Sequence, residues 1–275
     1  MESAGRGDAM NETHAGTKLS VNGLEMYHEV HGAGRPLVLL HGAMSTIETS
    51  FGAVLPLLAE SRRIVAPEQQ AHGHTPDIDR PLTYREMAED TAGLLRRLNI
   101  ESADLFGYSM GAGIALELAI RRPELVRKLV VASLAYDKDG FHPEIGKAIE
   151  SVQPEDLAGS VFEEAYAKTA PNPEDWPTLV GKCNQLDREF VGWPPADIQS
   201  INAPTLVIIG DSDIVRPEHA VETFRLLGGG VEGDSAGLPP SELAVLPGTT
   251  HLTLVMRAEW LASMVSAFLD APRQL

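Results

Sequence analysis

Residues 103–120 read ADLFGYSMGAGIALELAI and contain the feature that decides the fold. The run 103–106 is apolar without alternation, which is typical of a strand buried on both faces of a sheet. The pentapeptide GYSMG follows at 107–111, and a helical stretch begins inside it and continues to residue 120. This G-x-S-x-G pattern lies between a strand and a helix, where a tight, strained turn exposes a serine hydroxyl. We therefore predict that Ser109 is a catalytic nucleophile.

Short apolar runs alternate with longer helical stretches on both sides of this segment. The expected strands are 24–30, 37–40, 64–66, 103–107, 129–133, 205–210 and 243–246, and the expected helices are 83–98, 110–120, 217–227 and 257–269. Because alternating strands and helices need crossover connections, the sheet should be mainly parallel with helices on both faces. The pattern predicts the α/β class.

Residues 134–203 interrupt this alternation. They hold seven of the fifteen aromatic residues and seven of the nineteen prolines. Three segments begin with Pro-Glu, at residues 143, 154 and 173, and proline followed by acids favours the first turn of a helix. We expect a helical cap inserted between two strands, with an apolar underside formed by aromatic side chains.

A serine hydroxyl is a poor nucleophile without a base, so Ser109 needs a histidine and an acid elsewhere in the chain. The strand 205–210 ends in the loop that contains Asp211 and Asp213. The strand 243–246 is followed by PGTTH, which ends at His251. Both loops follow parallel strands and should lie at the same edge of the sheet as Ser109. His251 is the expected general base.

Together, these features resemble the α/β-hydrolase family, in members that carry an inserted helical cap, over about residues 20–270. The resemblance also includes His41-Gly42 and the Gly-x-x-Asp pattern at 210–213. It implies a mostly parallel eight-stranded sheet flanked by helices, with a core at 19–133 and 204–275 and a cap at 134–203. Residues 1–18 are expected to be a disordered tail.

The resemblance also implies roles for single residues. The catalytic acid should be Asp213, with Asp211 as the alternative, and the oxyanion hole should be formed by the amides of Ala43 and Met110. The sequence departs from the family at residues 67–74, PEQQAHGH, where relatives often carry an Asp and an Arg. Any family-specific role of that loop is therefore in doubt.

The expected reaction is hydrolysis of a small carboxylic ester with an apolar or aryl portion, through an acyl-enzyme and without a cofactor. We place Met44, Tyr108, Trp176 and Trp193 in the substrate pocket. Two alternatives use the same three side chains, namely hydrolysis of a carbon–carbon bond and acyl transfer. A further alternative is a hydrolase-like protein that only binds a ligand.

Composition excludes several other classes of function. A net charge of −17 repels phosphate backbones, so we expect neither nucleic acid nor a membrane as a partner. The single cysteine, Cys183, suits the reducing cytoplasm, and we expect it to be an incidental thiol in a helix. His72, His74 and Asp77 could be drawn as a metal site, but we expect none. The sequence leaves the oligomeric state open.

Overall fold

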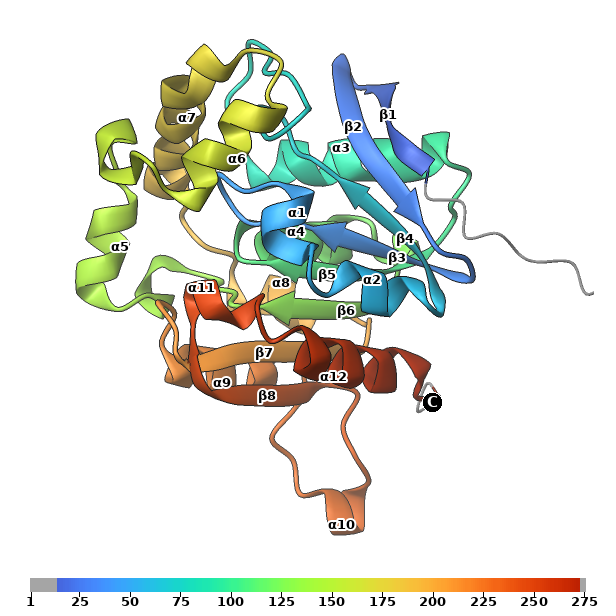
Figure 1. Cartoon of the computed structure of the whole chain (residues 1–275). Coiled ribbons are helices and arrows are strands. Elements are labelled where there is room, and N and C mark those ends of the chain that lie inside the picture. The colour runs from blue at the N-terminus through green and yellow to red at the C-terminus, as the bar shows by residue number, and fades with distance from the viewer. Residues whose placement is uncertain (1–13, 273–275) are drawn as a thin grey trace, which may run out of the picture.

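The computed structural model describes residues 14–272, and these residues form a mostly parallel eight-stranded sheet flanked by helices (Figure 1). The predicted fold class is confirmed. The strand order is β1-β2-β4-β3-β5-β6-β7-β8, in which β1 and β2 pair antiparallel and β3 to β8 run parallel. The strands are β1 His14–Val21, β2 Leu24–His31, β3 Arg35–Leu40, β4 Arg62–Pro67, β5 Ala103–Tyr108, β6 Val126–Ala132, β7 Thr205–Ser212 and β8 Glu242–Thr250.

The first strand corrects the expected tail. Residues 1–13 of that tail lie outside the described residues, but residues 14–18 belong to β1, which pairs with β2. Asn22 and Gly23 join the two strands, with φ angles of 50° and 85°. Positive φ at both positions matches the tight hairpin turn that Asn-Gly favours. The prediction missed this turn, although its sequence signal is present.

Helices cover both faces of the sheet because alternate strand residues enter two separate apolar clusters. On β5, Leu105 packs in the cluster under α3 and α4, while Phe106 packs in the cluster under α1, α2 and α12. None of the described helices is long and apolar enough to cross a membrane. The helices of this core are α1 Ile47–Phe51, α2 Leu55–Ala59, α3 Tyr84–Arg97, α4 Met110–Arg121, α9 Pro217–Leu226, α10 Gly233–Ala236, α11 His251–Leu254 and α12 Ala258–Asp270.

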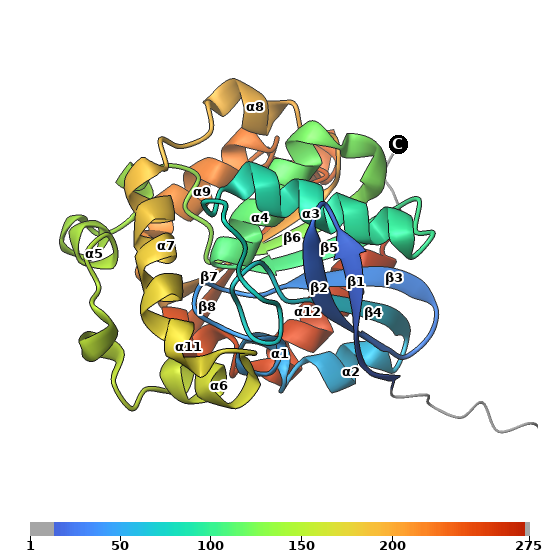
Figure 2. The same cartoon turned by 90° about the horizontal axis from the view of Figure 1, so that it is seen from above.

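The segment between β6 and β7 is helical. Helices α5, α6 and α7 gather beyond the carboxyl ends of the parallel strands, at the left in Figure 1. Helix α8 lies apart from them in Figure 2 and contacts α4 and α9 of the core. The α-helices of this segment are α5 Pro143–Ile149, α6 Val161–Thr169, α7 Trp176–Glu189 and α8 Pro195–Gln199. The short 3₁₀ turns are η1 Pro123–Leu125, η2 Lys138–Gly140, η3 Pro154–Leu157 and η4 Pro173–Asp175.

Candidate active site

Ser109 lies between β5 and α4, at the carboxyl edge of the sheet. Its backbone has φ 54° and ψ −119°, a conformation that side-chain-bearing residues rarely adopt. Strain of this kind persists only where the surroundings hold it in place, and it is common at functional turns. The turn leaves the Ser109 side chain partly exposed in a large cavity.

The two flanking glycines are required by close backbone contacts. A Cβ atom on Gly107 would lie 2.2 Å from the carbonyl oxygen of Gly111. A Cβ on Gly111 would lie 1.9 Å from the carbonyl oxygen of Leu40, on the neighbouring strand β3. Both distances are far below van der Waals contact, so α4 can start this close to β3 and β5 only with glycine at these positions.

A hydrogen-bonded chain joins Ser109, His251 and Asp213. His251 begins α11 directly after β8, and its Nε2 lies 3.0 Å from Ser109 Oγ. Its Nδ1 lies 2.9 Å from Asp213 Oδ1, in the loop after β7. Residues 109 and 251 are 142 positions apart in the chain, so only the parallel sheet brings them together.

Asp213 is buried, with 4% of its surface exposed, and three donors satisfy its carboxylate. Besides His251, Ser133 Oγ donates to Oδ2 at 2.6 Å and the Val215 N–H donates to Oδ1 at 3.2 Å. Burial alone would raise the pKa of Asp213, but the hydrogen bond from His251, its positive charge and these two donors hold the pKa below its usual value. Ser133 escaped the sequence reasoning because a single serine after a strand carries no distinctive signal.

Asp211 occupies a different environment from Asp213. It is exposed, and its carboxylate accepts the N–H groups of Gly248 at 2.9 Å and Thr249 at 3.1 Å. These two donors lower its pKa. Asp211 therefore holds the end of β8, directly before His251, while Asp213 contacts the imidazole itself.

Ala43 and Met110, the expected oxyanion-hole residues, both line the cavity beside Ser109. Met110 is the first residue of α4, and N–H groups in the first turn of a helix have no intrahelical acceptor. Ala43 lies in the loop after β3, next to Met44, which has the positive φ of 57°. The arrangement can present two backbone donors to a carbonyl oxygen held at Ser109.

Two buried histidines hold the loop that contains Ala43. His72 Nε2 accepts the N–H of Met44 at 3.1 Å, and its Nδ1–H donates to the carbonyl of Gln70 at 2.8 Å. His41 Nε2 accepts the N–H of Gln69 at 3.0 Å. Complete burial, with His41 nearby, lowers the pKa of His72 to about 3, so His72 is neutral and its Nε2 lone pair is free to accept.

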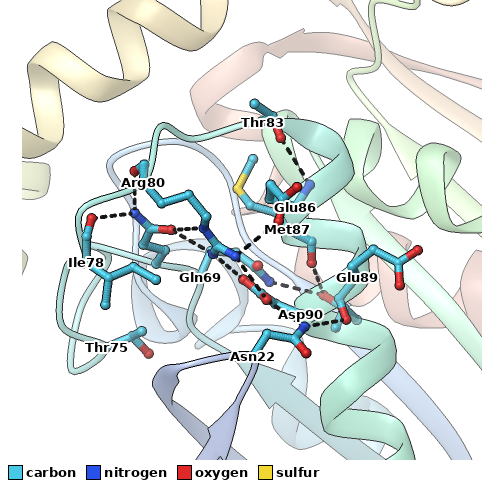
Figure 3. A network of polar contacts seen from close by, with 12 residues as sticks. Asn22, Gln69, Thr75, Ile78, Arg80, Thr83, Glu86, Met87, Glu89 and Asp90 are labelled. Atoms are coloured by element: carbon cyan, nitrogen blue, oxygen red, sulfur yellow. Dashed lines mark hydrogen bonds and ion pairs between the residues drawn. The ribbon is translucent and has the colours of Figure 1, made fainter.

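A polar network that includes Gln70 and Arg80 holds the loop after β4. Gln70 Oε1 accepts from Arg80 Nε at 2.9 Å and from Arg80 Nη2 at 2.7 Å. The Arg80 guanidinium also pairs with buried Asp90 on α3 at 2.5 Å, and Asn22 donates to the same carboxylate at 2.9 Å (Figure 3). The guanidinium of Arg80, ten residues after Gln70, therefore holds this loop against α3.

Lys182 on α7 joins the helical segment to the same loop. Its ammonium pairs with Asp77 at 2.7 Å and donates to the carbonyls of Ile78 and Arg80, both at 2.9 Å. Three acceptors satisfy the three donors of the ammonium group. Lys182 therefore fixes the position of α7 above the core.

The cavity at Ser109 has a volume of about 710 Å³ and lies between the strand ends and helices α5 to α7. Of the four predicted pocket residues, Met44 and Tyr108 line it. Most of its other lining side chains are apolar; they include Tyr84, Leu134, Phe141, Phe162, Phe190 and Leu252. The aromatic residues among them come from four separate places in the chain, which sequence patterns could not show to converge.

The prediction that Trp176 and Trp193 line the pocket is wrong. Trp176 is buried at the start of α7, where its ring packs on Tyr166 with centroids 5.4 Å apart. Trp193 is buried against the core, and its Nε1–H donates to Glu117 on α4 at 2.5 Å. An indole N–H needs an acceptor when buried, and here that acceptor lies away from the cavity.

Cys183 on α7 lines the cavity, and its Sγ lies 3.9 Å from His72 Nε2. Complete burial raises the pKa of this thiol, which disfavours the nucleophilic thiolate.

His74, which the sequence offered as a possible metal ligand, pairs with Glu68 at 2.9 Å. Within residues 14–272, no group of three or more His, Cys, Asp or Glu side chains could hold a metal ion.

Comparison with known proteins matches this chain to a hydrolase family and to individual hydrolases. The model of the alpha/beta hydrolase family matches residues 37–264. A 2-hydroxymuconate semialdehyde hydrolase from a Pseudomonas species is 39% identical over 128 residues, which cover 46% of this chain and 45% of that protein. A 2-hydroxy-6-oxo-2,4-heptadienoate hydrolase from Pseudomonas putida is 28% identical over 89% of this chain and 92% of its own length.

A solved structure also shares the fold. The meta-cleavage product hydrolase from Pseudomonas fluorescens superposes with a TM-score of 0.73 at 18% identity. The superposition covers 94% of this chain and 98% of the other.

Proposed function

Because the chain belongs to the α/β hydrolase family, we propose that it is a serine hydrolase that cleaves a carboxylic ester through an acyl-enzyme. The observation that carries this proposal is the chain of hydrogen bonds from Asp213 through His251 to Ser109, which opens on a mostly apolar cavity. In the proposed roles, Ser109 is the nucleophile, His251 the general base and Asp213 the residue that orients His251.

The reaction follows from these positions. His251 takes the proton of Ser109 Oγ as that oxygen attacks the ester carbonyl carbon. The amides of Ala43 and Met110 donate to the negative oxygen of the tetrahedral intermediate. When the intermediate collapses, the carbon–oxygen bond to the alcohol breaks, and His251 returns the proton to the leaving alcohol. Water, deprotonated by His251, then attacks the acyl-Ser109 ester. When this second intermediate collapses, the acid leaves and His251 returns the proton to Ser109 Oγ.

Carbon–carbon bond hydrolysis is the second candidate, because two relatives are named as hydrolases of a muconate semialdehyde and an oxo-heptadienoate. The name heptadienoate denotes a carboxylate, which a cavity would bind with a free cation. Two cations in the lining could bind such a carboxylate. Among residues 14–272, the guanidinium of Arg216 is bound only by the backbone carbonyl of Asp139, and Lys147 is exposed and forms no ion pair.

The test measures hydrolysis of p-nitrophenyl butyrate by the wild type and by Ser109→Ala. We expect kcat to fall by about 10⁵–10⁶ in the variant, because loss of the nucleophile removes the acyl-enzyme route. The matched control is Ser102→Ala, which alters an exposed serine before β5 and should retain wild-type turnover. A fluorophosphonate probe should label the wild type and the control but not Ser109→Ala.

Two outcomes contradict the proposal. Equal turnover and labelling in Ser109→Ala would remove Ser109 from the reaction. If the wild type neither hydrolyses the ester nor reacts with the probe, the protein would be one that only binds a ligand. Hydrolysis of a ring-cleavage dienoate is assayed beside the ester and is measured as a decrease in the absorbance of the dienoate. A higher kcat/KM for that dienoate would establish the second candidate instead.

A further inference from the structure

Asp187 on α7 contributes a carboxyl group to the cavity wall. It is partly buried and makes no hydrogen bond or ion pair with any residue between 14 and 272. Among the other charged lining residues, Lys138 and Glu150 pair with each other, Arg216 donates to the backbone carbonyl of Asp139, and the side chains of Asp139 and Lys147 are exposed to water. An unpaired carboxyl group in a mostly apolar cavity is a position at which a ligand can supply the missing partner.

The surroundings of Asp187 disfavour its negative charge. Burial and the nearby carboxylate of Glu150 raise its pKa to about 7, while Lys138 and Arg188 oppose this shift. Lys138 does not neutralise Asp187, because its ammonium is bound by Glu150 and by the carbonyl of Arg188 at 3.0 Å. A cation placed in the cavity would therefore find an acceptor whose charge is poorly compensated by the protein.

Two aromatic rings line the same cavity as this carboxyl group. Phe190 follows Asp187 by three residues at the end of α7, and Tyr84 lies close enough for Asp187 to affect its pKa. The rings of Tyr84 and Phe190 are 5.2 Å apart, cross at 66° and both line the cavity. Aromatic faces attract alkylammonium groups, and a carboxylate beside them adds a direct charge partner.

This wall of the cavity is close to the reacting centre. Cys183 lies one helical turn before Asp187 on α7 and is 3.9 Å from His72, which holds the loop containing Ala43. One turn of helix rises about 5.4 Å, so a substrate bound at Ser109 can extend along α7 to Asp187. The net charge of −17 would also draw cations toward the protein.

We propose that Asp187, together with the rings of Tyr84 and Phe190, forms a subsite for an alkylammonium group carried by the substrate. This inference rests on the proposed ester hydrolysis and names the class of ester: one with a positively charged amine on its acyl or alcohol part. Asp187 then determines specificity and takes no part in the bond-breaking steps.

The experiment compares charged esters with uncharged esters of the same shape. One pair is butyrylcholine and 3,3-dimethylbutyl butyrate, which places the charge on the alcohol. The other is ethyl 4-(trimethylammonio)butyrate and ethyl 5,5-dimethylhexanoate, which places it on the acyl group. In at least one pair, the wild type should show a kcat/KM about tenfold higher for the charged ester, and Asp187→Asn should abolish that preference.

Glu189→Gln is the matched control, since it removes the same charge from an exposed position on the same helix. The charged-to-uncharged ratio should be unchanged in this control. An equal fall in kcat/KM for both esters of a pair in Asp187→Asn would indicate a structural role and overturn the inference. A wild type without preference in both pairs would also overturn it. If no ester is hydrolysed and no probe labels Ser109, the proposed function itself fails.

The pH dependence of the ratio supplies an independent readout. Quaternary ammonium groups do not titrate, and effects of His251 on turnover cancel between the two esters of a pair. The ratio should rise as pH increases through about 7, where Asp187 ionises, and should stay flat in Asp187→Asn. The groups that act on the Asp187 carboxyl or are affected by it are Glu150 on α5, Lys138 in η2, Tyr84 on α3, and Cys183 and Arg188 on α7. A ratio independent of pH in the wild type would contradict the role of Asp187.

Discussion

The phenol of Tyr108 donates a hydrogen bond to the backbone carbonyl of His251 at 2.9 Å, and the two rings lie 5.2 Å apart. Tyr108 is the residue before Ser109, so the turn that carries the serine is tied directly to the start of α11. His251 is therefore held by two hydrogen bonds, one from its imidazole to Asp213 and one from this phenol to its backbone carbonyl.

Tyr108→Phe removes only that hydrogen bond. We expect the free energy of unfolding to fall by about 1 kcal/mol, the typical net contribution of one hydrogen bond. A less constrained His251 should also lower kcat for p-nitrophenyl butyrate by up to about tenfold, since small displacements of reacting groups are costly. The control is Tyr166→Phe, which removes a phenol of α6 outside the cavity. Wild-type kcat in Tyr108→Phe would show that the phenol does not position the imidazole.

Asp213→Asn and Asp211→Asn distinguish Asp211, near the end of β7, from Asp213, directly after it. Asp213→Asn should lower kcat by about 10³–10⁴, because an amide in place of the carboxylate neither orients His251 correctly nor supports its positive charge. Asp211→Asn should reduce the melting temperature and change kcat only slightly, since Asp211 holds the N–H groups of Gly248 and Thr249. Steady-state kinetics and thermal unfolding of both variants provide the measurement. A larger loss of kcat in Asp211→Asn would reverse the assignment.

Asp187 makes stability depend on pH in a defined direction. Its pKa is raised to about 7 in the folded protein, whereas an unfolded aspartate titrates near 3.9. The folded state therefore holds the proton more tightly, and stability falls as pH rises from about 4 to about 7. Asp187→Asn removes the loss of stability that ionisation of Asp187 causes. The melting temperature of this variant should therefore exceed that of the wild type by more at pH 8 than at pH 4. Parallel pH profiles for the two proteins would contradict the raised pKa.

Arg80→Ala should destabilise the fold strongly. It leaves the carboxylate of Asp90 buried on α3 without its cation, which typically costs about 3–5 kcal/mol. The double variant Arg80→Ala/Asp90→Asn no longer carries the uncompensated charge and should recover part of that loss. Urea unfolding of both variants and of Asp90→Asn completes the cycle. Strictly additive losses would show that the two side chains are not coupled.

Local signals in the sequence account for the parts of the fold that were predicted. Apolar runs without alternation mark the buried parallel strands, and the glycines of residues 107–111 mark a turn that only small residues can form. The missed strand β1 had a local signal as well, the Asn22-Gly23 turn. The catalytic roles of Ser109, Asp213 and His251 stay predictions, although their side chains lie within hydrogen-bonding distance in one chain.

The sequence by itself determined the class of fold, the position of the serine turn and the order in which the serine, the acid and the histidine follow one another. These features depend on residues that are neighbours in the chain. Only the tertiary structure decided that Asp213 and not Asp211 faces His251, that Trp176 and Trp193 lie outside the cavity lining, and that Asp187 lines the cavity without a partner among residues 14–272. The reason is that the rotation and packing of α7 and the path of the loop after β7 depend on contacts with distant segments, including Lys182 with the loop at Asp77 and Trp193 with Glu117.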